Sequence, residues 1–125
     1  MGARAAIGLL QGGRAAIGAA LLVAPVAAGE PWVGPVAEDP GGQVALRALG
    51  ARDLVLGLGA LRAAARGDSA SVAGWCLATA ACDVVDGFAT GSRRSELPSG
   101  GVPVMALAFG AAAAGVVLAA KAASA

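Results

Sequence analysis

Two carboxylates, Asp83 and Asp86, lie three residues apart inside an apolar stretch of this chain. A second apolar stretch carries Arg47, Arg52 and Asp53. A charged side chain at membrane depth costs about 3 kcal/mol or more unless it is paired or hydrated. Intramembrane charges therefore pair helices with one another, coordinate a cation or relay protons, and these are the roles that the sequence suggests.

The depth of each charge along its apolar segment suggests how the charges pair. Asp83 and Asp86 fall on one face of a helix because they are three residues apart. The segments before and after the short turn at residues 66–69 are expected to be antiparallel neighbours. At about 1.5 Å per residue, Arg52 is then level with Asp83, and Arg47 is level with Asp86.

Asp53 points about 100° away from Arg52 and needs a partner on another helix. Arg14 has a similar depth in the first apolar segment and is the expected partner. Gly50 and Gly57 indicate close helix contact around this region. A centre with balanced charges is more typical of structural pairing than of catalysis. The predicted charged centre consists of Arg14, Arg47, Arg52, Asp53, Asp83 and Asp86.

The elements that position these residues are four apolar segments. Each has roughly the 17–25 residues that cross a hydrocarbon core of about 30 Å. The chain has 125 residues, of which 58% are hydrophobic and 14% charged, whereas a soluble domain is about a quarter charged. We predict a single all-α domain, an integral membrane four-helix bundle of up-down-up-down topology, with helices over residues 5–28, 44–65, 72–90 and 102–120.

The links between the segments are also readable. Pro25 is expected to end or kink the first helix, and residues 30–42 contain too much Pro, Gly and acid for a helix interior. Trp32 lies where an interfacial aromatic residue is expected. Ser69 or Ser71 is the predicted N-cap of the third helix.

The basic residues predict the orientation in the membrane. Most of them fall on the side that holds both termini, which favours a cytoplasmic location for these ends, although Arg93 and Arg94 oppose it. The abundance of Ala and Gly indicates a bacterial genome of high GC content, so we expect a multi-pass protein of the bacterial cytoplasmic membrane. The basic residues on the side of the termini are Arg4, Arg14, Arg62, Arg66 and Lys121.

The first segment has an alternative interpretation as a signal peptide. Arg14, the apolar residues 15–23 and the small residues 24–28 follow the order of such a peptide. The stretch before the apolar residues would be long, and only three helices would remain to bury the charges. We therefore expect the first segment to stay attached as a helix.

The composition also excludes several functions. The chain contains no His, which rules out Ser-His-Asp triads and His-ligated zinc. It has no basic tract of the kind that binds nucleic acid. Cys76 and Cys82 are six residues apart and point in different directions on a helix, so they cannot bridge. We predict no catalytic residue, cofactor or metal ion; the expected partner is the lipid bilayer, and a homo-oligomer or a membrane protein partner stays open.

Two motifs carry a family resemblance. Residues 49–59, which include Gly50-Ala-Arg52-Asp53, precede the Asp83/Asp86 pair by about thirty residues. Together they resemble a family of small four-helix bacterial membrane proteins known only as a domain of unknown function. The resemblance implies the topology and marks these four charged residues, but it implies no activity. A looser similarity to DoxX-like membrane proteins rests on size and topology.

The segment Asp83-Val-Val-Asp86-Gly87 also resembles the opening of the metal-binding motif of CDP-alcohol phosphatidyltransferases. Thr90 and Gly91 stand where that family continues with Ala-Arg, and no second Asp pair follows. An enzyme acting on a lipid is therefore the third hypothesis. The first is a structural or accessory membrane protein held together by its charged centre, and the second is a small transporter or a proton or cation pathway.

Overall fold

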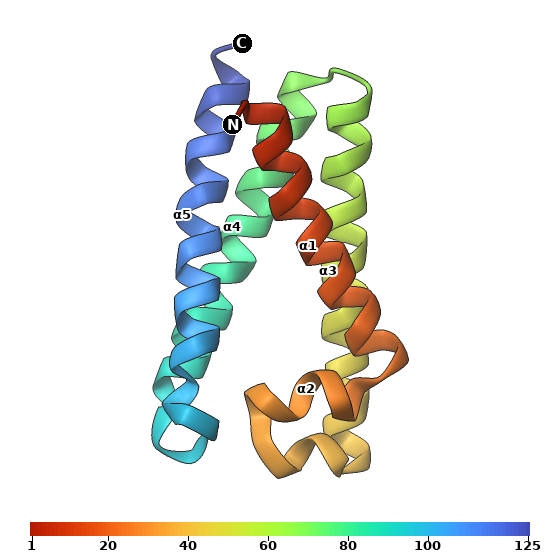
Figure 1. The fold of residues 1–125 in the computed structure, drawn as a ribbon, viewed down its shortest axis with the longest axis vertical. Helices are drawn as coiled ribbons and strands as arrows, with labels where there is room; N and C mark the ends of the chain where they lie inside the picture. The colour runs from red at the N-terminus through yellow and green to blue at the C-terminus, as the bar shows by residue number, and fades with distance from the viewer.

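The computed structural model describes all 125 residues, and the chain is helical throughout, without strands. The chain contains four long helices, and Figure 1 shows that they run alternately down and up, with short helices gathered at one end. The long helices are α1 (Ala3–Val23), α3 (Pro40–Ala65), α4 (Ser69–Ser92) and α5 (Val102–Ala123). The short helices are α2 (Pro25–Val33), η1 (Gly34–Glu38), η2 (Arg94–Glu96) and η3 (Pro98–Gly101), of which the η elements are 3₁₀ helices.

The long helices form two closely packed pairs, α1 with α3 and α4 with α5. The helices α3 and α4 are joined by a short turn but contact each other much less than the partners within each pair. Adjacency in the sequence therefore identifies the α4/α5 pair but not the partner of α3, because the helix that follows the short turn after α3 belongs to the other pair.

Glycine allows the backbones of α1 and α3 to approach closely. A Cβ atom on Gly18 would lie 2.5 Å from Leu54 N and 2.6 Å from Gly50 O, and a Cβ atom on Gly57 would lie 2.7 Å from Gln11 O. No side chain larger than hydrogen fits at these positions without moving the helices apart. The contact predicted around Gly50 and Gly57 is confirmed, and it brings the middle of α1 against the middle of α3.

The first long helix ends at Val23, five residues before the predicted end at Ala28. Ala24 precedes Pro25 and has φ −132° and ψ 67°, outside the helical region. The residue before a proline is disfavoured in the helical region, which accounts for this break. Pro25 then begins α2 at a position where a helix needs no backbone N–H.

Residues 30–42 were predicted to lie outside any helix interior, and this prediction is wrong. Three short stretches of helix, α2, η1 and the start of α3, cover nearly all of it. Pro35 and Pro40 lie in the first turns of their helices, so they remove no hydrogen bond, and only Pro31 lies inside a helix. Gly34 ends α2 with a φ of 73°, which glycine adopts readily.

The start of α4 also differs from the prediction of a serine N-cap. Asp68 caps the helix: its carboxylate accepts hydrogen bonds from Ser71 N at 3.0 Å and from Ser71 Oγ at 2.6 Å. Ser69 is the first residue of the helix instead. The other predicted helices are shorter than the observed ones by a few residues, since α3 begins at Pro40 and α5 extends to Ala123.

The exterior of the molecule is apolar to a degree that is unusual for a soluble protein. Large apolar side chains such as Leu9, Phe88 and Leu107 are exposed, and the largely apolar interior also holds several polar and charged groups. Three segments are long and apolar enough to cross a membrane: α1, α4 and the residues Pro98–Ala123 that include α5. The buried polar and charged residues are Gln11, Arg14, Asp53, Thr79, Asp83 and Thr90.

Candidate functional site

Five charged side chains form one connected set between the two helix pairs, which we call the charged network. In order of contact they are Asp83, Arg14, Asp53, Arg52 and Asp86. The order alternates in sign and begins and ends on α4, with one contribution from α1 and two from α3. The network therefore joins the α1/α3 pair to α4 through side chains instead of close backbone contact.

Arg14 is the member of the network with the least exposed side chain, at 7%. Its Nη2 contacts Asp83 Oδ2 on α4, and its Nη1 lies 3.4 Å from Asp53 Oδ1 on α3. The contact of Arg14 with Asp53 is the predicted one. The close packing of α1 on α3 accounts for it, because it sets Arg14 and Asp53 at the same depth.

Arg52 makes the second set of contacts. Its Nε and Nη2 lie 3.1 and 3.0 Å from Asp53 Oδ1, and its Nη1 and Nη2 lie 3.1 and 2.6 Å from the two oxygens of Asp86. The contact with Asp86 is bidentate, a geometry that adds both strength and specificity. Asp53 Oδ1 accepts from both arginines and therefore links the two halves of the network.

The predicted pairs Arg52–Asp83 and Arg47–Asp86 are both wrong. Depth matching considered only two helices, but Arg14 enters from α1 and takes Asp83, and Arg52 reaches Asp86, three residues further along α4. Arg47 is exposed and donates from its Nε to the carbonyl of Leu22 at 3.2 Å. Arg47 is thus outside the network.

The position of Arg47 changes the charge balance. The predicted centre had three arginines and three aspartates, whereas the network has two arginines against three aspartates. Its formal charge with all groups ionised is 2 − 3 = −1. One carboxylate charge in the interior is therefore not matched by a guanidinium.

A layer of uncharged polar groups lies beside the network and was missed by the sequence analysis. Gln11 is fully buried on α1, and its Nε2 donates to Thr79 Oγ1 on α4 at 3.3 Å. Gln11 Oε1 and Arg14 Nε are buried without a hydrogen-bond partner. Spacing could have identified this layer, because Gln11 precedes Arg14 by three residues and Thr79 precedes Asp83 by four, so each shares a face with a charged residue.

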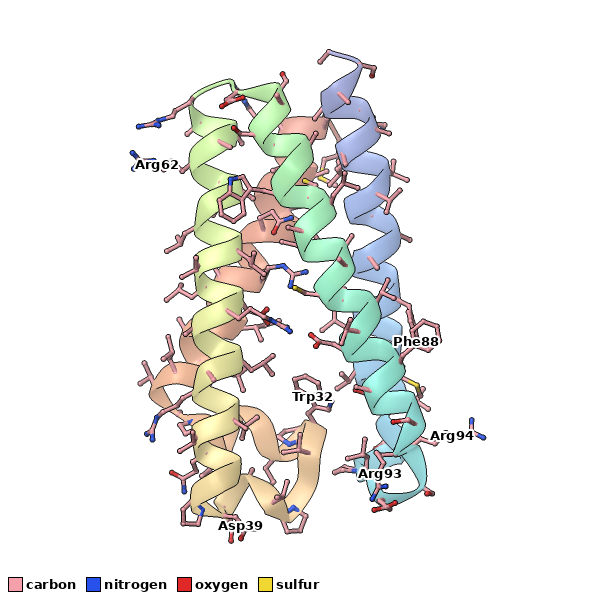
Figure 2. The ribbon with its side chains drawn as sticks, turned by 180° about the vertical axis from the view of Figure 1, so that it is seen from behind. Trp32, Asp39, Arg62, Phe88, Arg93 and Arg94 are labelled. Atoms are coloured by element: carbon pink, nitrogen blue, oxygen red, sulfur yellow. The ribbon has the colours of Figure 1, made fainter.

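Trp32 makes a further polar contact, which joins the short helix α2 to α4. Its Nε1 donates to Thr90 Oγ1 at 3.0 Å. In Figure 2 the Trp32 side chain extends from α2 toward α4. Trp32 was expected at an interface with the membrane, but this half-buried side chain has a partner within the protein.

The cysteines and the acidic residues form no disulfide or metal centre. Cys76 is buried, Cys82 is half-buried, and both are free thiols. No three His, Cys, Asp or Glu side chains are placed to hold a metal ion together. The charged network is thus the candidate functional site, and its chemistry is that of paired, partly unbalanced charges in an apolar surrounding.

Comparisons of the chain with protein-family models, with curated proteins and with solved structures find no match.

Proposed function

We propose that the protein is an integral membrane protein whose charged network holds its two helix pairs in register, in a structural or accessory role. The observation that carries this proposal is the alternating order Asp83–Arg14–Asp53–Arg52–Asp86 across the interface between the pairs. Apolar helices that are rich in Ala and Gly have few features that specify one alignment. Buried charge pairs supply such a feature, because a shift in register would leave charges unpaired.

The proposal includes α3 as a fourth membrane-spanning helix beside α1, α4 and α5. Its 26 residues extend over about 39 Å, more than the hydrocarbon core of about 30 Å. Arg52 and Asp53 belong to the network, while Val55 and Leu58 are exposed. The central charges of α3 therefore face protein partners, and its outward face suits lipid.

Extraction and labelling test the membrane location and the orientation. The protein should stay with membranes at alkaline pH. In a background with Cys76 and Cys82 replaced by Ala, Ser69→Cys should be labelled from the cytoplasmic side and Glu38→Cys from the other side. Release at alkaline pH would refute the membrane proposal, and cytoplasmic labelling of Glu38→Cys alone would reverse the orientation.

A double-mutant cycle on Arg52 and Asp86 tests the structural role. Arg52→Leu leaves Asp86 without a cation and should destabilise by about 3 kcal/mol or more. Asp86→Leu leaves Arg52 in contact with Asp53, and the double change removes the orphaned carboxylate, so both should cost clearly less. The matched control is the exposed pair of Arg93 and Glu96, with side chains 67% and 60% exposed, for which about 0–1 kcal/mol is expected. Equal losses of stability in the Arg52/Asp86 cycle and in the Arg93/Glu96 cycle would refute the structural role.

A second candidate function, a proton or cation pathway, is favoured by one observation. The network has three carboxylates and two guanidiniums, so it becomes neutral when it takes up one proton or one monovalent cation. Intramembrane carboxylates of this kind occur in proton relays and ion pathways. The unpartnered polar atoms of Gln11 and Arg14 beside the network are sites that water could fill.

Flux measurements in proteoliposomes separate the two candidates. Asp86→Asn leaves two carboxylates against two guanidiniums and keeps an oxygen that can accept from Arg52, so the fold should persist. A pathway through the network predicts proton or sodium flux in the wild type and its loss in this variant. If the wild-type protein is folded and the liposomes are sealed, the absence of flux would refute the pathway and leave the structural role.

A further inference from the structure

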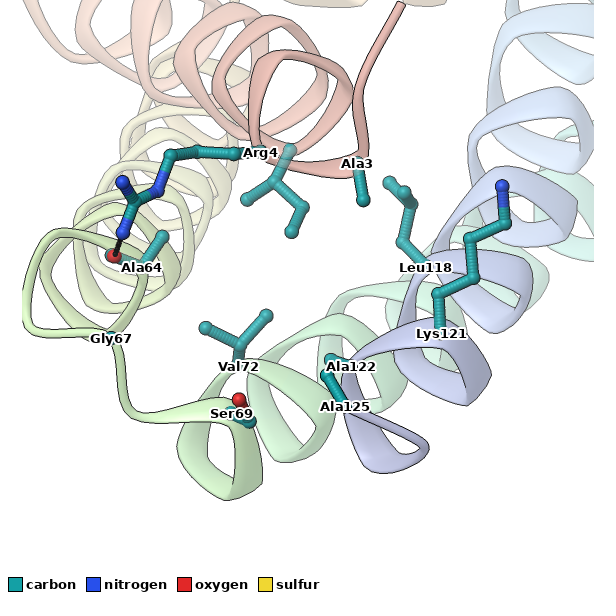
Figure 3. Close-up of a pocket in the computed structure, with 11 residues that line it drawn as sticks. Ala3, Arg4, Ala64, Gly67, Ser69, Val72, Leu118, Lys121, Ala122 and Ala125 are labelled. Atoms are coloured by element: carbon teal, nitrogen blue, oxygen red, sulfur yellow. Dashed lines mark hydrogen bonds between the residues drawn. The ribbon is translucent and has the colours of Figure 1, made fainter.

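A cavity of about 260 Å³ opens at the end of the bundle where α1 begins, α3 turns into α4, and α5 ends. Figure 3 shows the opening framed by these four helices. Ile7, Val72 and Leu118 form its apolar wall, and each of them is less than 8% exposed. The cavity is therefore a hydrophobic hollow at an end of the molecule, and none of its lining residues belongs to the charged network.

Two basic side chains border this cavity. Figure 3 shows Arg4 on α1 and Lys121 on α5 at different sides of the opening. Neither has a carboxylate within salt-bridge distance, and Arg4 makes only a long hydrogen bond of 3.4 Å to the carbonyl of Ala64. Asp68, which lies between the cavity-lining residues Gly67 and Ser69, directs both of its oxygens to Ser71.

Arg4 also borders a second hollow of about 270 Å³ in the groove between α1 and α3. Gly8, Leu61 and Ala65 line this groove, and a Cβ atom on Gly8 would meet no other atom within 4 Å. A positive group thus lies between two apolar hollows, one inside the end of the bundle and one on its side. This arrangement suits a ligand that has one anionic group and two apolar arms.

We propose that this end of the bundle binds an anionic phospholipid, with its phosphate between Arg4 and Lys121 and its acyl chains in the two hollows. A free anion would leave the apolar walls exposed to water, and a zwitterionic lipid would place its own cation beside two others. Basic pockets between membrane helices on the cytoplasmic side bind anionic headgroups by the same electrostatics. The inference rests on the proposed membrane location but not on any role of the charged network.

Native mass spectrometry of the detergent-solubilised protein tests the inference by comparing phosphatidylglycerol with phosphatidylcholine of identical acyl chains. The wild type should retain phosphatidylglycerol preferentially. Removal of each basic group should weaken its binding by about fivefold, so Arg4→Gln with Lys121→Gln should lose roughly 25-fold. The control is Arg93→Gln with Arg94→Gln, which removes the same charge from the opposite end and should leave the preference unchanged.

Three results would overturn the inference. Equal retention of the two lipids by the wild type would exclude a headgroup-specific site, and this comparison needs no variant. An equal loss in both double variants indicates general attraction to the net charge of the protein. Full competition by glycerol 3-phosphate indicates a site for the free phosphate alone. A protein that stays in membranes but lacks the lipid preference refutes only this inference, whereas release from membranes refutes the proposed function.

Discussion

The substitution Arg14→Gln should be the most damaging single change to the charged network. Arg14 contacts both Asp53 and Asp83, and it supplies the only guanidinium that reaches Asp83. Asp53 keeps its contact with Arg52 in the variant. The cost therefore falls mainly on Asp83, whose side chain is only 8% exposed and would lose its counter-charge.

The expected magnitude follows from this burial. Breaking a buried charge pair by removing one partner costs about 3–5 kcal/mol, because the remaining charge is desolvated without compensation. This loss is comparable to much of the total stability of a protein, about 5–15 kcal/mol. Arg93→Gln, which removes the cation of an exposed pair, should cost no more than about 1 kcal/mol.

The assay is unfolding of the purified protein in mixed micelles by increasing denaturing detergent. A rescue variant identifies the mechanism: Asp83→Asn added to Arg14→Gln removes the orphaned charge and should restore about 2 kcal/mol or more. Stability of Arg14→Gln within about 1 kcal/mol of the wild type would refute the role of Arg14. A large loss that Asp83→Asn does not restore would show that the cost comes from packing and not from charge.

Two further predictions concern packing and pH. Gly18→Ala should destabilise by about 1–3 kcal/mol, because its methyl group would overlap the backbone of α3. Gly13→Ala on the same helix meets nothing within 4 Å and should stabilise by up to about 1 kcal/mol; equal thermal stability of the two variants would contradict this contrast. The hydrogen bonds from the hydroxyl and backbone N–H of Ser71 lower the pKa of Asp68 below its ordinary value of about 4. The cap should therefore stabilise the fold above pH 4 and lose this effect as the pH falls through the lowered pKa, so melting curves of wild type and Asp68→Asn should converge in acid and not at neutral pH.

The sequence predicted the long helices because apolar length and breaks at Gly, Pro and charged residues are local properties. It failed between residues 30 and 42, where a high content of Pro, Gly and acid was expected to exclude a helix interior. Proline opposes helix only beyond the first turn, and all but one of the prolines in this stretch lie in a first turn. The composition of the stretch was informative, but the position of each proline within it decided the structure.

The sequence predicted the presence of the buried charges better than it predicted their pairing. Asp83 and Asp86 were assigned to one helix face correctly, but the identity of their partners depends on which helices pack and at what tilt. Both wrong pairs assumed that α3 is the only neighbour of α4 at that depth. Arg14 could reach Asp83 only because α1 packs closely on α3, a contact between helices separated by the whole of α2 and η1.

The two kinds of helix contact in this molecule have different consequences. Within the α1/α3 pair, glycines bring the backbones together, and nothing at that contact can be adjusted without steric overlap. Between the pairs, the joining groups at the centre are long side chains of Arg14 and Arg52, whose contacts depend on the charge of their partners. A change in the protonation of Asp83 or Asp86 therefore acts on the interface between the pairs, whereas Asp53 also joins α1 to α3 within one pair through Arg14. For this reason the structural role and the proton pathway are competing interpretations of the same residues, and the unmatched carboxylate is the feature on which the two can be separated by experiment.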